Sequence, residues 1–146
     1  MNWKLKSLRL SCKFIFGGAA YNSIEMMWRG YTHISMTFLG GLCFCMLLYM
    51  AGLKYGLFPK IILSGSLITA AEFIAGCVVN IWLGLEVWDY GDEFFNLLGQ
   101  VSLRFFVLWC LLSAAVILPC IYFKRNVKAF SNGFKTLYSR FGFNSN

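Results

Sequence analysis

The chain has 146 residues, of which 59% are hydrophobic and 18% aromatic, and its mean hydropathy is +0.65. A single soluble domain of this length cannot bury so much apolar surface, so we expect the protein to lie in lipid. The formal net charge of +7 does not indicate nucleic-acid binding, because the Lys and Arg residues gather between apolar runs and accompany no nucleic-acid-binding motif. The composition therefore predicts an all-α, polytopic membrane protein.

The N-terminal segment, residues 1–13, combines basic side chains with Trp and Leu and is interpreted as a basic interfacial segment. The apolar run FIFGGAA that follows is short for a secretory signal, so we do not expect cleavage. The first membrane span is predicted at residues 14–28, and its two adjacent glycines would permit close helix contact. Polar and small residues there recur every three or four positions and should face protein rather than lipid. They are Gly18, Asn22, Glu25 and Arg29.

The second span is predicted at residues 33–53, which contain no charged residue apart from His33, and Gly40 and Gly41 offer it a thin surface for a neighbouring helix. The turn before it covers only Arg29 to Thr32, so the first two spans should pack against each other as antiparallel neighbours. Glu25 would then end one helix and His33 would open the next.

The third span is predicted at residues 61–85, after a loop that contains glycine, proline and two lysines. Its polar side chains form a second stripe at offsets of three and four residues: Thr69, Glu72, Gly76 and Asn80. The following segment, residues 86–100, contains four carboxylates and several aromatic residues. It is interpreted either as a solvated acidic turn within an aromatic belt or as a mouth that gathers a cationic or metal-bound ligand.

The fourth span is predicted at residues 97–123, with Pro119 as a tolerated kink. A third polar stripe would open it, formed by Asn96, Gln100 and Arg104 at positions i, i+4 and i+8. Residues 124–146 are predicted to form a basic amphipathic helix that lies on an anionic leaflet. Its apolar side recurs every three or four residues as Phe123, Val127, Phe130, Phe134, Leu137 and Phe141.

Cysteine usage does not indicate a metal site or a disulfide framework. The chain has six cysteines, but four of them lie inside apolar runs and no two show C-x-x-C spacing. We interpret Cys43, Cys77, Cys110 and Cys120 as small core residues. No metal and no cofactor are expected.

Orientation follows from the distribution of basic residues. Four spans would place the N-terminal segment, the loop around residues 54–60 and the C-terminal tail on one side, and these segments hold eleven of the thirteen Lys and Arg residues. That side is predicted to be cytoplasmic, in the inner or plasma membrane. Arg29 and Arg104 are the two exceptions.

The two exceptional arginines are expected to pair with intramembrane acids, because a bidentate bridge recovers much of the cost of a charge in hydrocarbon. Glu72–Arg104 is predicted as the main pair and Glu25–Arg29 as the outer one, with crossed pairs as the alternative. The polar residues either specify helix association or line a polar, outward-opening, ligand-binding cavity. The candidate cavity residues are Glu25, Arg29, His33, Glu72, Asn80, Asp89, Asn96, Gln100 and Arg104.

Such a cavity would suit proton relay, because His titrates near neutrality. Hydrolysis is less favoured, since the chain has one histidine and lacks the G-x-S-x-G, H-E-x-x-H and P-loop motifs. No catalytic residue is therefore assigned.

Three stretches carry a family resemblance: GGAAYNSIEMMWRGYTHISMTFLGG, EFIAGCVVNIWLGLEVWDY and FNLLGQ. They resemble bacterial membrane proteins grouped as ABC-transporter permeases of the CmpB type, over about residues 16–121. The resemblance implies an ATPase subunit as partner and, because such permeases are larger, a homo-oligomer or larger membrane complex. The positions of interest that it implies are Glu25, Arg29, Thr32, His33, Glu72, Asn80, Trp88, Asp89, Tyr90, Asn96 and Gln100.

The expected function is that of a small permease-like or transport-associated subunit in contact with membrane lipids. One alternative is a noncatalytic membrane interaction or scaffold protein that recruits partners through its C-terminal helix. A further alternative is a membrane enzyme acting on a lipid or envelope precursor, with Glu25 or His33 as base and Arg29 or Arg104 holding a phosphate. The domain organisation is predicted as residues 1–13, a membrane domain at 14–123 and a tail at 124–146.

Overall fold

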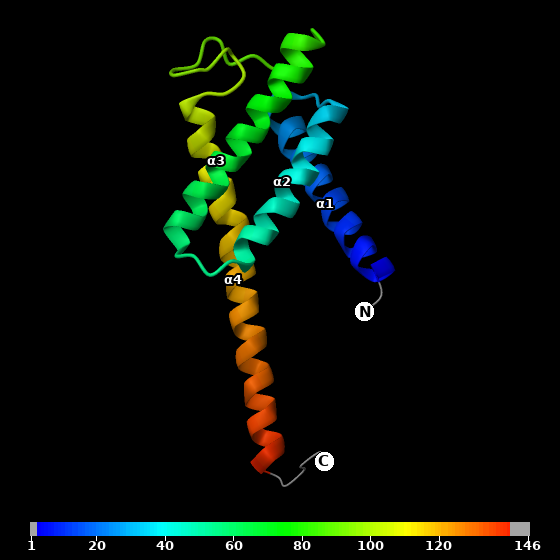
Figure 1. Cartoon of the computed structure of the whole chain (residues 1–146), viewed down its shortest axis with the longest axis vertical. Helices are drawn as coiled ribbons and strands as arrows, with labels where there is room; N and C mark the ends of the chain where they lie inside the picture. Colours follow the sequence, from blue (N-terminus) through cyan, green and yellow to red (C-terminus); the bar gives the residue numbers. More distant parts are fainter. Residues whose placement is uncertain (1–2, 141–146) are drawn as a thin grey trace.

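The computed structural model describes residues 3–140, with side chains up to residue 132. Phe141 and the rest of the predicted tail beyond residue 140 lie outside the described residues, as do Met1 and Asn2. The described part is all-α, as predicted (Figure 1). Its elements are α1 (Trp3–Arg29), α2 (Ile34–Gly52), α3 (Leu57–Gly76), the π-helix η1 (Cys77–Trp82) that continues α3, and α4 (Leu103–Arg140).

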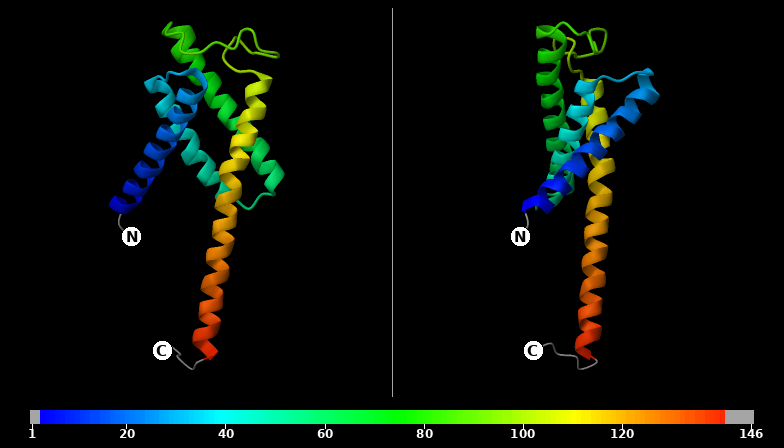
Figure 2. Two further views of the ribbon diagram at one scale, coloured as in Figure 1. Left: turned by 180° about the vertical axis from the view of Figure 1, so that it is seen from behind. Right: turned by 90° about the vertical axis from the view of Figure 1, so that its right-hand side faces the viewer.

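The helices alternate in direction along the chain. The start of α1 and the turn between α2 and α3 lie on the side from which the C-terminal part of α4 projects, and the α1–α2 turn and the 83–102 loop lie on the opposite side (Figure 2). α1 packs mainly on α2, whereas α4 packs mainly on α3. The space between α1 and α4 is therefore left without close helix packing.

Three helices are long and apolar enough to cross a membrane: Ile34–Gly52, Leu57–Trp82 and Leu103–Asn132. They make the chain a membrane protein. α1 is not among these three helices, because it contains basic residues in its first half and Glu25 and Arg29 near its end. Residues 14–28 as a fourth span therefore stay a prediction.

The third helix begins earlier than predicted, at Leu57 rather than at residue 61. Pro59 lies in its first turn, where a backbone N–H has no intrahelical partner and proline is tolerated. The regular α-helix ends at Gly76, and the chain continues as η1 to Trp82.

The fourth helix begins at Leu103, so the prediction of a span from residue 97 is wrong. Residues 97–101 instead form a closed turn, in which the Leu97 N–H donates to the Val101 carbonyl at 2.9 Å. Leu98 and Gly99 adopt positive φ angles of 52° and 68°, which an α-helix cannot accommodate. The predicted third stripe, which assumed helix from Asn96 to Arg104, is therefore also wrong.

The basic amphipathic segment is not a separate helix, because α4 runs without a break from Leu103 to Arg140 and contains Pro119. At a rise of about 1.5 Å per residue, 38 residues extend over roughly 57 Å. Figure 1 shows the C-terminal part of α4 projecting past the other helices. The position of residues 124–140 relative to a membrane stays a prediction.

Glycines allow α1 and α2 to approach closely, as their sequence positions predict. A Cβ atom added at Gly18 would lie 2.6 Å from the Thr37 carbonyl oxygen, and one added at Gly41 would lie 2.7 Å from the Phe14 carbonyl oxygen. Both distances are shorter than a normal contact and both partners are backbone atoms. The close packing of α1 on α2 therefore requires glycine, which has no side chain, at these two positions.

The apolar core is centred on α2. Buried α2 side chains meet Ile68 of α3, Ile117 of α4 and the loop residues Val87 and Trp88. Cys43 belongs to this core, as expected, while Cys77, Cys110 and Cys120 are half-buried and all six cysteines are free. The loop that follows η1 is therefore packed into the fold.

The close approach of α1 and α2 predicts that Gly18→Val lowers thermal stability. The added side chain must displace backbone, and overpacking of this kind costs about 1–3 kcal/mol. Thermal unfolding of the detergent-solubilised protein measures the loss. Gly52→Val is the control, because a Cβ there would meet only the Lys124 Nζ atom at 3.5 Å; equal destabilisation by both variants would contradict the prediction.

Candidate functional site

The site begins at the corner between α1 and α2. Gly30 ends α1 with φ +76°, a conformation that suits glycine at a helix C-terminus. His33 is the N-cap of α2, and its Nδ1 atom accepts from the Ser35 N–H at 3.3 Å. The predicted arrangement, with Glu25 near the end of one helix and His33 opening the next, is confirmed.

Glu25 and Arg29 form an ion pair on the last turns of α1, which confirms the predicted outer pair. The second Glu25 oxygen accepts from the Thr32 hydroxyl at 2.7 Å, and the Glu25 residue is only 6% exposed. Arg29 also donates from Nη1 to the Val87 carbonyl at 3.0 Å, and its guanidinium lies 5.0 Å from the centre of the Tyr31 ring. The pair, with Glu25 buried and Arg29 half-buried, therefore ties the α1 corner to the loop after η1.

Glu72 does not pair with Arg104, so the predicted main intramembrane pair is wrong. The Glu72 carboxylate is completely buried and accepts from the Tyr90 hydroxyl at 2.9 Å and from the Trp109 indole N–H at 2.6 Å. Arg104 instead pairs with Glu93 at 2.8 Å, with 55% of its side chain exposed. The reason is the late start of α4, which places Arg104 in the first helical turn beside the loop.

Asn80 and Gln100 hold the 83–102 loop against η1. The Asn80 amide donates to the Trp88 carbonyl at 2.9 Å and to Gln100 Oε1 at 2.8 Å, and it accepts from the Val87 N–H at 2.8 Å. The Trp88 indole N–H donates to the Gln100 carbonyl at 3.0 Å. These two polar side chains are thus committed to positioning the loop.

Asn96 closes the outer part of the same loop. Its amide donates to the carbonyls of Gly91 and Glu93 at 2.9 and 3.0 Å, and it accepts from the Gly99 N–H at 3.2 Å. Such side-chain to backbone bonds replace the hydrogen bonds that a helix would have supplied. This explains why the chain can stay non-helical from residue 83 to residue 102.

Tyr90 brings the loop onto α4. Its ring stacks on Phe105 with the ring centres 4.0 Å apart, and its hydroxyl donates to Glu72. Burial raises the pKa of the Tyr90 phenol above its usual range, and the Glu72 carboxylate raises it further. Tyr90 therefore keeps its proton and its role as a donor.

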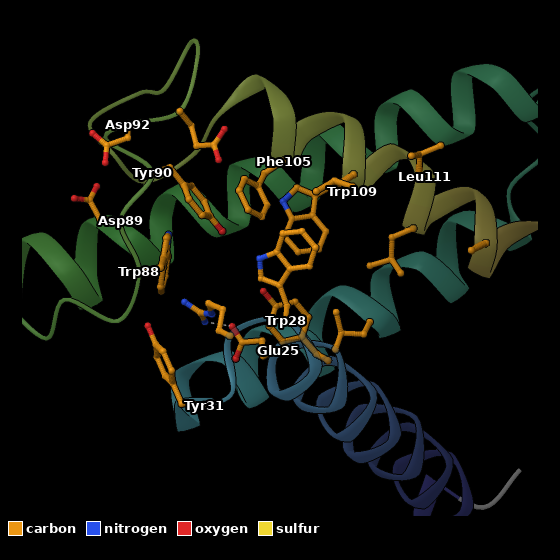
Figure 3. Close-up of a pocket in the computed structure, with 17 residues that line it drawn as sticks. Glu25, Trp28, Tyr31, Trp88, Asp89, Tyr90, Asp92, Phe105, Trp109 and Leu111 are labelled. Atoms are coloured by element: carbon orange, nitrogen blue, oxygen red, sulfur yellow. Dashed lines mark hydrogen bonds and ion pairs between the residues drawn. The ribbon is translucent and has the colours of Figure 1, made fainter.

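A pocket of about 750 Å³ lies between the end of α1, the 83–102 loop and the first half of α4, and we name it the α1–α4 pocket. Figure 3 shows Asp89 and Asp92 at one end of it and Leu111 at the other. A second pocket of about 190 Å³ adjoins it and contains Glu72. The residues common to both are Tyr21, Ile24, Trp109 and Leu112.

The nine predicted cavity residues are distributed over different places. Glu25, Arg29 and Asp89 line the α1–α4 pocket, and Glu72 lines the smaller one. The other five line neither of these two pockets: His33, Asn80, Asn96, Gln100 and Arg104.

An aromatic wall lines the α1–α4 pocket, and of its members the family resemblance pointed only to Trp88 and Tyr90. Sequence reasoning missed the other five: Tyr21, Trp28, Tyr31, Phe105 and Trp109. A signal for part of this wall was present. Tyr21, Glu25 and Trp28 follow helical spacing of four and three on α1, and Phe105, Trp109 and Leu112 do so on α4. Each set therefore shares one helix face, and the two faces meet at the pocket.

The fold and site define a small all-α membrane protein with a polar, aromatic pocket near one end. A sequence model of the family described as "Putative ABC-transporter type IV" matches residues 12–141. The chain belongs to this CmpB-type family, which confirms the resemblance seen in its sequence. No curated protein and no solved structure matches the chain.

The contacts of Glu72 predict that Glu72→Leu is strongly destabilising, because it leaves the Tyr90 and Trp109 donors unpaired at about 1–3 kcal/mol each. Arg104→Ala should cost less than about 1 kcal/mol, since it removes only an exposed ion pair. Thermal unfolding in detergent compares the two variants. A larger loss of stability for Arg104→Ala would contradict the assigned hydrogen bonds and would support a Glu72–Arg104 pair instead.

The buried corner pair predicts that Arg29→Leu destabilises the protein by about 3 kcal/mol, because it leaves the Glu25 charge buried without a cation. The double variant Glu25→Leu/Arg29→Leu should be more stable than Arg29→Leu alone, since no isolated charge remains. Unfolding midpoints of the two variants and the wild type form the measurement. A double variant less stable than Arg29→Leu would show that the buried, unpaired Glu25 charge does not cause the destabilisation by Arg29→Leu.

Proposed function

We propose that the protein is a small transport-associated membrane subunit whose ligand binds in the α1–α4 pocket. The observation that carries the proposal is the pocket itself. Its volume of about 750 Å³ lies within the range of small-molecule sites, roughly 300–1,000 Å³. Charged side chains meet an aromatic wall there, a combination that suits selective ligand binding.

The proposed topology has four membrane-crossing helices, including α1, in the cell membrane, with the pocket facing outward. The distribution of basic residues supports it, since eleven of the thirteen Lys and Arg residues belong to segments at the end opposite the pocket or to the continuation of α4. Such an excess marks the cytoplasmic side. The packing of α1 on α2 through glycines supports α1 as the fourth crossing helix.

We further propose that a separate ATPase subunit supplies the energy and that the transport unit is a homo-oligomer or larger complex. The family to which the chain belongs supports an ABC-type partner. The sequence itself has no P-loop, the loop that holds ATP phosphates in such ATPases.

A noncatalytic interaction protein is the second candidate function, and one observation favours it. Asn80, Asn96 and Gln100 direct their amide groups to the chain's own loop. Under this alternative the polar residues serve only to hold the fold, and blocking the pocket would have no effect on function.

The proposed function predicts that Ala115→Trp reduces transport about tenfold. Ala115 lines the α1–α4 pocket at its apolar end, so the indole would occupy ligand space without removing a polar contact. Cells lacking the gene and cells carrying the wild-type or variant gene would be compared for accumulation of a panel of labelled small solutes. Accumulation of at least one solute should differ between wild-type and deletion cells. Ala115→Trp should remove about 90% of that difference in accumulation, a tenfold reduction.

Ala70→Trp is the matched control, because Ala70 is exposed on α3 and lines neither described pocket. It should insert and transport like wild type. Identical accumulation of every solute in wild-type and deletion cells would refute the transport proposal, and full activity of Ala115→Trp would refute the assignment of the pocket.

A further inference from the structure

The α1–α4 pocket has negative charge that no described cation neutralises. Its single lining cation, Arg29, is already engaged by Glu25 and by the Val87 carbonyl. Asp89 and Asp92 line the pocket and form no salt bridge with any described side chain. A ligand that enters this end therefore meets uncompensated carboxylates, and charge complementarity favours a cation.

The aromatic wall lies where such a cation would bind. Trp28 and Tyr31 are 67% and 55% exposed, and Figure 3 shows both on the α1 side of the pocket, with Tyr90, Phe105 and Trp109 on the α4 side. Faces of Trp, Tyr and Phe attract cations electrostatically, most strongly when the cation is poorly hydrated, as in quaternary ammonium groups. The wall therefore favours an organic cation over a small hydrated metal ion.

The opposite end of the pocket is apolar. Leu108, Leu111, Leu112 and Ala115 line it on α4, and Ile24 lines it on α1. From Leu103 to Ala115 the α4 helix rises about 18 Å, so the pocket extends well away from the acidic loop. The adjoining 190 Å³ pocket continues between α1, α2, α3 and α4, where its lining is apolar apart from Tyr21, Glu72 and Trp109.

We infer that the α1–α4 pocket binds a lipophilic organic cation, with its amine or onium head near Asp89 and Asp92 and its apolar body along α4. This inference rests on the proposed ligand-binding role of the same pocket. It names the ligand class and the carboxylates that select it.

Tetraphenylphosphonium and tetraphenylborate test the inference, because the two ions have nearly the same shape and opposite charge. Binding of each labelled ion to full-length protein in nonionic detergent is measured by equilibrium dialysis. The phosphonium should bind saturably. Its binding should weaken as the salt concentration is raised, because salt screens exposed carboxylates. Equal or tighter binding of the borate, or no saturable binding of either ion, would overturn the inference.

Asp89→Asn/Asp92→Asn should weaken phosphonium binding by about tenfold, because it removes two uncompensated charges. The amide oxygen introduced by Asp89→Asn can still accept from the Gly91 N–H, so the local turn is kept. Trp28→Leu should weaken binding by about two- to fivefold through loss of the aromatic face. Glu86→Gln is the control, since Glu86 is an exposed carboxylate of the same loop that does not line the pocket. Unchanged affinity in the double variant, with Glu86→Gln as reference, would contradict the assignment.

Failure of this inference is distinguishable from failure of the proposed function. Dialysis requires no transport, so selective phosphonium binding with no solute difference in cells would keep the ligand class and refute the transport role. Conversely, transport that Ala115→Trp blocks but that phosphonium does not inhibit would keep the transport role and refute the ligand class.

Discussion

The buried carboxylate of Glu72 is the group on which the rest of the fold depends. It lies on α3 and accepts hydrogen bonds from Tyr90 of the loop and Trp109 of α4. Trp109 in turn stacks on Tyr21 of α1, with ring centres 6.0 Å apart. A carboxylate away from water needs donors, and here the donors are neutral aromatic groups from two other parts of the chain. One buried acid thus connects three helices and the loop.

The α1–α4 pocket is a consequence of how the helices pair. α1 is held by α2 through glycines, and α4 packs mainly on α3. The gap between the two outer helices is then bridged by aromatic side chains rather than by close backbone packing. The 83–102 loop covers one end of this gap because Asn80 and Arg29 bind its backbone. The pocket therefore combines an aromatic wall, an acidic end and an apolar end.

The polar residues of the chain divide by what they contact. The side chains of Asn80, Asn96 and Gln100 bind the loop backbone, and His33 caps α2. Glu25, Arg29 and Asp89 line the pocket. Arg29 belongs to both groups, because it lines the pocket and also donates to the Val87 carbonyl of the loop. Spacing along a helix could not show which polar residues hold the loop and which line the pocket.

The sequence by itself determined the membrane class through its composition and the family through motifs spread along the chain. It also predicted the α1–α2 corner and the Glu25–Arg29 pair, because these residues lie within one or two helical turns of each other. Only the tertiary structure decided the partners of Glu72 and the start of α4. The turn at residues 97–101 delays the start of α4 to Leu103, so Arg104 lies beside Glu93 and pairs with it. The partners of Glu72 lie 18 and 37 residues away in the chain, and helical periodicity carries no information over such distances.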